Sequence, residues 1–411
     1  MQGEDGKAFE VCRTCLSLPQ KLEMTQEPRP RIAIVGPAQP FRGGIAHFSN
    51  RLAQALDGPF EVDLLTFTRQ YPALLFPGKT QLESSEWKLP SRPEQLIDSI
   101  GPASWRRSGK WLAERRPDII MLVHWLPFFV PSYLGVIRHY QRALPGGARR
   151  AHLNLFLHNL FPHKYFPLTR PLMRRLVRRA DSCLTLSPHV TEQLRSFRPD
   201  ASVLEGFHPV YDIFEAAIPP PEARARLGLR EAPTMLFFGY VRRYKGLDLL
   251  IEALPRIRRS VDAQLVIAGE FYDDRERIEG RISELGLGDA VRVFSDYIPN
   301  EEVHLYFSSA EVVVQPYRSA NAASGVAKTA FNFNKPMIVT DLGGIAEDVP
   351  DGVAGYVVPP EDPASLADAV VRFFDHGPET FHDGVEAQKK RFSWDALTDE
   401  LERFFRERVS T

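Results

Sequence analysis

The feature that most restricts the fold of this chain is a strand–turn–helix pattern that occurs twice, in segments about two hundred residues apart. In the segments that begin at Arg31 and Met235, a short apolar run leads through glycines into a helical pattern. Helix N-termini present free backbone N–H groups and a partial positive charge, so each turn is a candidate anion site. The two segments predict a cleft that holds a diphosphate between two α/β domains.

Short apolar runs and helical stretches also alternate between these segments, which is typical of βαβ units around a parallel sheet. In the first half, we expect strands at 31–36, 62–67, 119–123, 153–157, 182–186 and 202–204. Helices are expected at 44–56, 104–115, 131–140, 171–179 and 188–196. Residues 68–100 are rich in proline and show no clear period, which indicates a long excursion from the repeating pattern.

The alternation stops at residues 206–233, where several prolines indicate an interdomain connection. It resumes with expected strands at 234–238, 264–268, 291–294, 312–315 and 337–340, and helices at 247–258, 275–285, 301–309, 324–333, 365–374 and 394–406. The predicted fold class is α/β, with two doubly wound Rossmann-like domains, 31–205 and 234–388, facing each other across a cleft. Residues 389–411 are expected to form a C-terminal helix that packs back on the N-terminal domain.

Composition excludes several classes of protein. The 411 residues exceed what one core usually supports, and the net charge of −1 argues against general nucleic-acid affinity. No apolar run reaches the roughly 18 residues of a spanning helix, and the first residues lack the apolar core of a signal peptide. Residues 1–30 lack periodicity, are interpreted as a leader without a fold of its own, and contain a second candidate start at Met24. We therefore expect a cytoplasmic protein.

The three cysteines fit a reducing compartment. Cys12 and Cys15 have a paired spacing, but no second Cys or His pair lies nearby to complete a zinc site, so the sequence predicts no bound metal.

The turn after the second glycine-marked strand contains the strongest candidate for phosphate binding. Arg242, Arg243 and Lys245 lie between Gly239 and Gly246, near the start of a predicted helix. Cations at this position make charge-assisted contacts with a diphosphate and stabilise it as a leaving group. A solvated basic turn is the alternative interpretation.

Small residues mark two further candidate anion sites. Gly43 and Gly44 open the first predicted helix and let a phosphate or an acceptor approach the backbone. A tight turn without a bound ligand is the alternative interpretation of these glycines. Ser324 precedes another predicted helix, where the backbone N–H groups of Gly325 and Val326 could bind phosphate or sugar oxygens. A serine N-cap explains the same residues, and both interpretations can hold.

Histidines end two of the predicted strands. His124 and His158 follow apolar runs whose carboxyl ends are expected to face the cleft, and His163 lies shortly afterwards. A histidine in this position can hydrogen-bond a sugar hydroxyl or move a proton, although a single strand-end histidine is usually structural. We take His158 and His163 as acceptor-side candidates.

The order of these motifs resembles the large retaining glycosyltransferase family of GT-B fold, family 4. The similarity rests on Gly-Gly-Ile at 43–45, Phe-Phe-Gly at 237–239 with Arg-Tyr-Lys-Gly at 243–246, the run from Lys335 to Glu347, and Gly-Tyr-Val-Val at 355–358. It covers about residues 31–407, which makes it specific for the family but not for a substrate. Residues 31–53 and 67–81 resemble a bacterial subgroup whose members are mostly described only as glycosyltransferases.

The resemblance implies roles for individual residues. Gly43 and Gly44 match the loop near the donor diphosphate and the acceptor, and His124 matches the histidine that contacts the transferred sugar. Arg243 and Lys245 match the pair of cations on the diphosphate. Residues 293–298, which include Tyr297, match the segment that borders the nucleotide base.

The chain departs from the family pattern at three of these positions. Tyr240 occupies the place directly after the glycine where the family usually has an arginine. Two glutamates that the family commonly carries before the Lys-Pro dipeptide are Asn321 and Thr329 here. Asn321 can still hydrogen-bond a sugar hydroxyl and Thr329 a ribose hydroxyl, but neither carries a charge. The resemblance thus implies a variant donor site.

The implied activity is transfer of a hexosyl group from a nucleotide diphosphate sugar, UDP- or GDP-linked, to a glycan or lipid-linked acceptor with retention at the anomeric carbon. The chain contains no Asp-x-Asp sequence, so we expect a metal-independent enzyme without a cofactor. Because no carboxylate is placed as a nucleophile by the sequence, front-face departure and attack are favoured over a covalent intermediate.

Two other functions remain open from the sequence. A catalytically silent relative that binds a sugar nucleotide or a protein partner would explain the missing glutamates, although the retained cations argue against it. A sugar-nucleotide epimerase of the same fold would need carboxylates or further histidines in the cleft, and the sequence indicates few of them.

Two segments could touch the inner face of an anionic membrane. Residues 170–179 are basic and apolar at helical spacing, and residues 125–131 are aromatic and apolar. An ordinary surface helix with Leu172, Met173, Leu176 and Val177 in the core is the slightly favoured alternative for the first segment.

Overall fold

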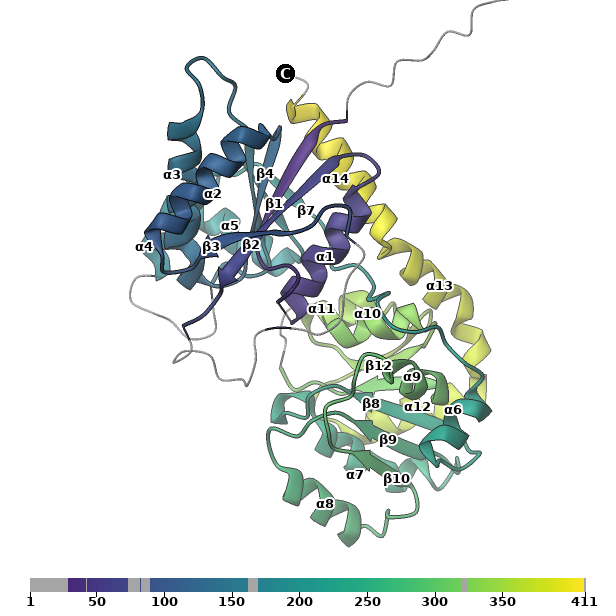
Figure 1. Cartoon of the computed structure of the whole chain (residues 1–411). Helices are drawn as coiled ribbons and strands as arrows, with labels where there is room; N and C mark the ends of the chain where they lie inside the picture. The colour runs from purple at the N-terminus through teal and green to yellow at the C-terminus, as the bar shows by residue number, and fades with distance from the viewer. Residues whose placement is uncertain are drawn as a thin grey trace, which may run out of the picture.

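The computed structural model describes residues 29–41, 43–72, 82, 89–161, 169–319 and 324–409. In these residues the chain forms two α/β domains, each built on a fully parallel sheet (Figure 1). The N-terminal sheet has seven strands in the order β3-β2-β1-β4-β5-β6-β7, and the C-terminal sheet has six in the order β10-β9-β8-β11-β12-β13. These two doubly wound sheets confirm the predicted fold class.

The N-terminal domain follows the expected alternation of strands and helices. Its strands are β1 (Arg31–Val35), β2 (Glu61–Arg69), β3 (Glu94–Asp98), β4 (Ile119–His124), β5 (His152–Leu157), β6 (Ser182–Thr185) and β7 (Val203–Glu205). Its helices are α1 (Gly44–Leu56), α2 (Pro102–Arg115), α3 (Val130–Ala143), α4 (Thr169–Val177) and α5 (Pro188–Phe197).

The C-terminal domain contains β8 (Thr234–Phe238), β9 (Gln264–Ala268), β10 (Val291–Phe294), β11 (Val312–Gln315), β12 (Met337–Thr340) and β13 (Gly355–Val358). Its helices are α6 (Pro220–Leu227), α7 (Leu247–Ile257), α8 (Arg275–Glu284), α9 (Val303–Ser309), α10 (Gly325–Asn332), α11 (Gly343–Asp348), α12 (Pro363–His376) and α13 (His382–Arg391), followed by α14 (Trp394–Val409). A 3-10 turn, η3 (Arg243–Lys245), follows β8.

Two elements lie inside segments for which the sequence predicted neither a helix nor a strand. Strand β3 lies within the supposed excursion 68–100 and helix α6 within the supposed connection 206–233. β3 is an edge strand in which only Ile97 is buried, so it lacks the apolar run that marks the other strands. α6 is held by the buried Arg224, which forms an ion pair with Glu311 and donates to the Ser309 carbonyl, rather than by an apolar stripe. Helices α11 and α13 were likewise not predicted.

The sequence order of the strands reverses at one place in each sheet. In the N-terminal sheet β1 lies between β2 and β4, and in the C-terminal sheet β8 lies between β9 and β11. Chain segments that leave neighbouring strands in opposite directions open a crevice at the carboxyl edge of the sheet. The glycine-marked turns after β1 and β8 and the residues after β4 and β11 therefore border these two crevices.

Helix α14 ties the end of the chain to the N-terminal domain. It runs along α1 in Figure 1, and Leu397, Leu401 and Phe405 join the apolar face of the N-terminal sheet on which α1 also packs. The indole N–H of Trp394 donates to the Val210 carbonyl at 3.1 Å. The chain thus crosses between the domains twice, at residues 206–219 and again before α14. Among the described residues, no helix is long and apolar enough to cross a bilayer.

Loss of apolar contacts on α14 should destabilise the N-terminal domain. Leu401→Ala removes a fully buried side chain from the interface with α1, and we expect a loss of about 2–5 kcal/mol in the free energy of unfolding. Asp399→Ala, at an exposed position of the same helix, should change it by less than about 0.5 kcal/mol. Urea unfolding followed by circular dichroism measures both; equal effects of the two substitutions would contradict the packing of α14.

Candidate functional site

Lys245 is a buried cation at the carboxyl edge of the C-terminal sheet. Its residue is 7% exposed, and its Nζ lies 5.9 Å from the centre of the Tyr317 ring. Burial, together with the smaller effect of the nearby Arg242 charge, lowers its pKa to about 8. No carboxylate forms an ion pair with Lys245 in the part of the chain that the structure describes. A buried charge without a counter-charge is costly, which makes this position fit for an anionic ligand.

Two glycines bring the Lys245 ammonium group to the edge of the crevice. Gly246 has φ +68°, and a Cβ there would lie 2.0 Å from the Pro316 carbonyl oxygen, so only glycine lets η3 pack against the end of β11. At Gly239, a Cβ would lie 3.0 Å from the Nζ of Lys245 and 3.5 Å from Cγ2 of Val326. The Lys245 ammonium group and the start of α10 therefore both lie beside Gly239, on the side to which a Cβ would point.

The amino end of α10 contains the predicted residues Ser324, Gly325 and Val326. Ser324 is buried and shares a 3.1 Å hydrogen bond with the Tyr317 hydroxyl, and its side chain caps no backbone N–H of the helix. Gly325 is exposed, and its N–H group belongs to the first turn, where intrahelical acceptors are missing. Thr329 donates its hydroxyl to the Gly325 carbonyl at 3.0 Å and is buried, so a ligand would have to compete with that bond.

The other residues of the basic turn lie nearer to solvent. Arg243 is exposed, and its backbone N–H donates to Asp273 at 3.4 Å, while the Arg242 guanidinium lies 4.8 Å from the centre of the Tyr272 ring. Tyr240 and Tyr272 contact each other edge to face with ring centres 5.1 Å apart, and Tyr297 is 59% exposed. The turns after β8, β9 and β10 thus present three exposed aromatic rings on the outer side of Lys245.

On the N-terminal domain, the predicted residues border the crevice between β1 and β4. Gly43 and Gly44 are exposed at the amino end of α1, and Gly43 has φ +110°, a conformation that favours glycine. His124 ends β4, is fully buried, and has no hydrogen-bond partner for either ring nitrogen among the described residues. Burial lowers the pKa of His124 to about 3, so the ring is neutral at physiological pH.

Two further histidines lie beside His124. His158 follows β5, stacks on Phe156 and contacts Phe48 of α1 edge to face, and its Nε2 is buried without a partner among the described residues. Burial, together with the neighbouring His208 and His124, lowers the pKa of His158 to about 3, and burial lowers that of His208 to about 4. The structure thus brings the predicted pair together and adds a third histidine from the interdomain connection.

His208 also links the two domains. Its ring lies 5.2 Å from that of Phe48 on α1, and its Nε2 lies 3.1 Å from the hydroxyl of Tyr211. Tyr211 in turn packs against the amino end of α10, where a Cβ on Gly325 would come within 3.3 Å of its ring. Phe48, His208, Tyr211 and Gly325 therefore form a continuous contact from one candidate anion site to the other.

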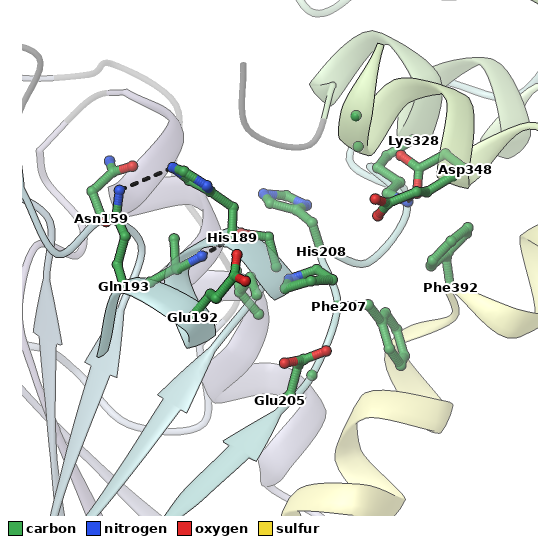
Figure 2. A pocket seen from close by; sticks show the side chains of 18 of the residues that line it. Asn159, His189, Glu192, Gln193, Glu205, Phe207, His208, Lys328, Asp348 and Phe392 are labelled. Carbon is green, nitrogen blue, oxygen red and sulfur yellow. Dashed lines mark hydrogen bonds and ion pairs between the residues drawn. The ribbon is translucent and has the colours of Figure 1, made fainter. Parts of the chain in front are cut away.

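A large cavity opens between the domains on the side of the two chain crossings. Its volume is about 980 Å³, and Figure 2 shows Asn159, His189 and Gln193 of the N-terminal domain facing Lys328, Asp348 and Phe392. None of the predicted site residues that the structure describes lines it. Five carboxylates do, and the expectation that carboxylates are sparse in the cleft is therefore wrong: Glu192, Glu205, Glu347, Asp348 and Glu400. They come from α5, β7, α11 and α14, which only the fold brings together.

Lys328 forms a buried ion pair at the edge of this cavity. Its Nζ donates to Oδ1 of Asp348 at 2.6 Å and lies 3.1 Å from the centre of the Phe392 ring (Figure 2). Burial lowers the pKa of Lys328 to about 8 and raises that of Asp348, in each case against the effect of the partner's opposite charge. The pair connects α10 to α11 and to the segment before α14, and its compensated charge contrasts with that of Lys245.

Asn321 and His163, as well as Arg42, lie outside the described residues. Among those described, no group of three or more His, Cys, Asp or Glu side chains is arranged to hold a metal ion. Four residues that border the site were not predicted from the sequence: His208, Tyr211, Tyr272 and Lys328. The sequence offered two indications of them: a histidine and a tyrosine at the start of the interdomain connection, and a lysine in the apolar stretch of α10.

Known proteins resemble both domains. Residues 43–205 match the family described as "Glycosyl transferase 4-like domain", and residues 232–376 match "Glycosyl transferases group 1". The chain is 29% identical over 258 residues to the alpha-D-kanosaminyltransferase of Streptomyces kanamyceticus, an alignment that covers 60% of this chain and 66% of the relative. It is 31% identical over 216 residues, 50% of this chain and 56% of the relative, to the GDP-mannose-dependent alpha-(1-6)-phosphatidylinositol monomannoside mannosyltransferase of Mycolicibacterium smegmatis.

The matched part of the chain thus spans less than two thirds of these relatives' own lengths. Among solved structures, Anabaena HepE in complex with UDP superposes with a TM-score of 0.66 at 16% identity, covering 92% of this chain and all of that one. At this level of identity the similarity shows a common fold.

The buried neutral histidine predicts a loss of stability in acid. In the unfolded chain His124 binds a proton below pH about 6.5, whereas in the folded chain its pKa is about 3. The free energy of unfolding should therefore fall as the pH drops from 6.5 towards 3, by about 1–2 kcal/mol at pH 5 from this residue. Urea titrations at pH 7.5 and 5 should show a smaller difference for His124→Leu than for wild type.

His382→Leu is the matched control, because its imidazole is 58% exposed on α13. It should leave the pH difference unchanged. An undiminished pH difference in His124→Leu would show that His124 does not titrate as its burial requires.

Proposed function

Because the chain belongs to the group 1 glycosyltransferase family of GT-B fold, we propose that it transfers a hexosyl group from a nucleotide diphosphate sugar to a glycan or lipid-linked acceptor with retention. The observation that carries this proposal is Lys245, a buried cation without a carboxylate partner in the described chain, beside the amino end of α10. A donor diphosphate supplies the missing negative charge. UDP and GDP are the favoured donor nucleotides, since similar proteins are described in complex with UDP or as GDP-mannose-dependent.

In the proposed reaction the diphosphate departs from the anomeric carbon towards Lys245 and the backbone N–H groups at Gly325 and Val326. These groups stabilise charge as it develops on the leaving oxygen. The acceptor hydroxyl attacks from the same face, and its proton passes to the departing phosphate. Arg243, exposed on the same turn, would add a second cation to the diphosphate once the donor is bound.

The N-terminal domain would supply the sugar and acceptor contacts. His124 is neutral, so one ring nitrogen can donate and the other accept, which suits a sugar hydroxyl. Its two unpartnered nitrogens favour a ligand at this position. His158, with a buried unpartnered Nε2, is proposed on the acceptor side, and Gly43 and Gly44 leave the amino end of α1 open to the acceptor or the donor phosphate.

Aromatic side chains at the outer edge would bind the nucleotide base. Tyr240, Tyr272 and Tyr297 offer exposed rings on the turns after β8, β9 and β10, and bases stack on aromatic faces. Thr329 would have to exchange its bond to the Gly325 carbonyl for a ribose hydroxyl. Asn321 would replace a charged family residue near the sugar.

A sugar-nucleotide epimerase is the second candidate function. The five carboxylates of the interdomain cavity favour it, because epimerisation needs acids and bases in the cleft. They lie on the side of the chain crossings, however, and one of them, Asp348, is already paired with Lys328. Incubation of the donor without an acceptor separates the candidates, since an epimerase interconverts two sugar nucleotides whereas a transferase releases the nucleoside diphosphate slowly by hydrolysis.

Substitution of the cations should strongly weaken donor binding. Lys245→Ala and Arg243→Ala together remove two charge-assisted contacts, and we expect donor affinity to fall by about 10- to 100-fold or more. Isothermal titration with UDP-, GDP- and ADP-sugars, in the presence of a chelator, measures the effect. Arg259→Ala, an exposed arginine after α7 in the same domain, is the control and should bind as wild type does. If no sugar nucleotide binds wild type, the proposed donor site is wrong.

Donor binding should weaken as the pH rises past the pKa of Lys245. The free protein has a pKa of about 8 at this residue, so the cation is lost above pH 8 and the attraction for the diphosphate with it. The dissociation constant should be nearly constant from pH 7 to 7.5 and then increase, approaching tenfold per pH unit above 8. A flat profile from pH 7 to 9.5 would contradict a role of the Lys245 charge.

A further inference from the structure

The outer layer of helices on the N-terminal domain carries an unusual excess of positive charge. Helices α2, α3, α4 and α5 all pack on the same face of the N-terminal sheet, opposite α1 and α14. Figure 1 shows α2, α3 and α4 together at the side of this domain that lies away from α14. Thirteen cations in or beside these helices are exposed: Arg106, Arg107, Lys110, Arg115, Arg116, Arg138, Arg142, Arg170, Arg174, Arg175, Arg178, Arg179 and Arg195. We call this surface the basic face.

Few negative charges balance the basic face. The four helices, which the structure describes in full, contain only two carboxylates, Glu114 and Glu192. Glu114 pairs with Lys110 at 3.5 Å, and among the described residues Arg115, which pairs with Asp63 at 2.8 Å, is the only one of the twelve arginines of the face that forms an ion pair. The C-terminal domain differs, because its surface arginines are mostly paired, as in Arg256 with Asp368 and Arg281 with Glu252.

The excess extends to the whole domain. Over residues 29–205 Arg and Lys outnumber Asp and Glu by roughly two to one, whereas acidic residues are in excess over 206–411. The overall charge of −1 therefore hides two domains of opposite sign. An anionic surface would attract the N-terminal domain, repel the C-terminal domain and so orient the molecule.

Helix stability does not account for the basic face. Cations in the last turn of a helix interact favourably with its dipole, which explains Arg115, Arg142, Arg174, Arg175 and Arg195. Arg170, however, is the second residue of α4, and Arg106 and Arg107 lie in the first half of α2, where the dipole gives them no advantage. Clustered like charges repel each other, so the face lowers the stability of the free protein.

Two hollows on the basic face have the size and charge for phosphate groups. Between α2 and α3, a hollow of about 830 Å³ is lined by Arg106, Lys110, Arg116, His139 and Arg142, with Glu114 as the single carboxylate. The two helices pack closely, since a Cβ on Gly109 would lie 2.5 Å from the Tyr140 nitrogen and a Cβ on Gly135 would lie 2.4 Å from the Trp105 ring. A second hollow of about 490 Å³, between α4 and α5, is lined by Arg174, Arg178 and Arg198, with Asp200 as a carboxylate that pairs with Arg198 at 3.5 Å.

We propose that the basic face docks on the surface of an anionic lipid bilayer, with lipid phosphates in the two hollows. The apolar side chains of the layer support surface docking without insertion: Met173, Leu176 and Val177 are buried, Leu172 packs against the core, and Phe129 and Val130 of the segment 125–131 are buried as well. None of the large apolar side chains that are exposed in the described chain lies on the four helices. In this proposal the contact with the bilayer is made by the cations of the basic face, and not by the apolar side chains of residues 125–131.

A membrane fits the face better than a nucleic acid does. The cations spread over the width of four helices and two separate hollows instead of following one groove, and among the described residues no exposed aromatic side chain on which bases could stack lies between them. Because the attraction is electrostatic, binding should require anionic lipid and weaken with salt.

Co-sedimentation of the full chain with vesicles tests the proposal. Vesicles of phosphatidylcholine with about one third phosphatidylglycerol should bind the protein at 50 mM salt, at least tenfold more tightly than pure phosphatidylcholine, and release it by about 300 mM. Arg106→Gln/Arg142→Gln/Arg174→Gln/Arg178→Gln should weaken binding at least tenfold. The matched control removes four cations of the C-terminal domain: Arg256→Gln/Arg258→Gln/Arg259→Gln/Arg281→Gln should bind at least as well as wild type.

Each outcome decides the question. Equal binding to neutral vesicles, or equal loss in both quadruple variants, would overturn the proposal. If wild type ignores anionic vesicles but binds a duplex RNA through the same four arginines, the face serves a nucleic acid and the membrane proposal is wrong. No donor or acceptor is present in this assay, so its result is independent of the proposed transferase activity; unchanged thermal unfolding of both variants shows that they fold.

Discussion

The candidate site depends on one constraint, the shared direction of the strands in two parallel sheets. All strands of such a sheet end at the same edge, and the reversal of their order at β1/β4 and β8/β11 separates the connections that follow. The two crevices face each other because the chain crosses between the domains before α6 and again before α14. Residues as distant in sequence as His124, His208 and Gly325 are thereby brought into one connected site.

The buried cations of the molecule differ in whether a carboxylate compensates their charge. Arg224 and Lys328 lie in the protein interior with carboxylates, Glu311 and Asp348, within ion-pair distance. Lys245 is buried to a similar extent but faces an aromatic ring and the backbone of Gly239 instead of a carboxylate. Desolvation penalises all three cations, and only the last lacks compensation from the described chain. This difference distinguishes a structural lysine from one that is available to a ligand.

Much of the fold could be predicted from the sequence, because buried parallel strands are continuous apolar runs that need no long-range information to recognise. Strands β8, β9, β10, β11 and β12 begin and end at the predicted residues. The predictions were wrong for β3 and α6, which are held by edge pairing and by the buried Arg224 rather than by their own apolar pattern. At the site, the sequence placed Lys245 and His124 at strand ends but could not show that one is uncompensated or that the other has no partner.

The sequence by itself determined the two-domain α/β architecture, the strand-end positions of the candidate residues and the total charge. These follow from local periodicity and from counting, which depend on neighbours in the chain. Only the tertiary structure decided which side chains share a cavity or a crevice. It brought together five carboxylates, three histidines and the Lys328–Asp348 pair, whereas the sequence indicated few titratable side chains between the domains. It also separated the charges in space, since a helix shows its outward face only after its inward face is packed. The near-neutral chain thus became a basic domain and an acidic one.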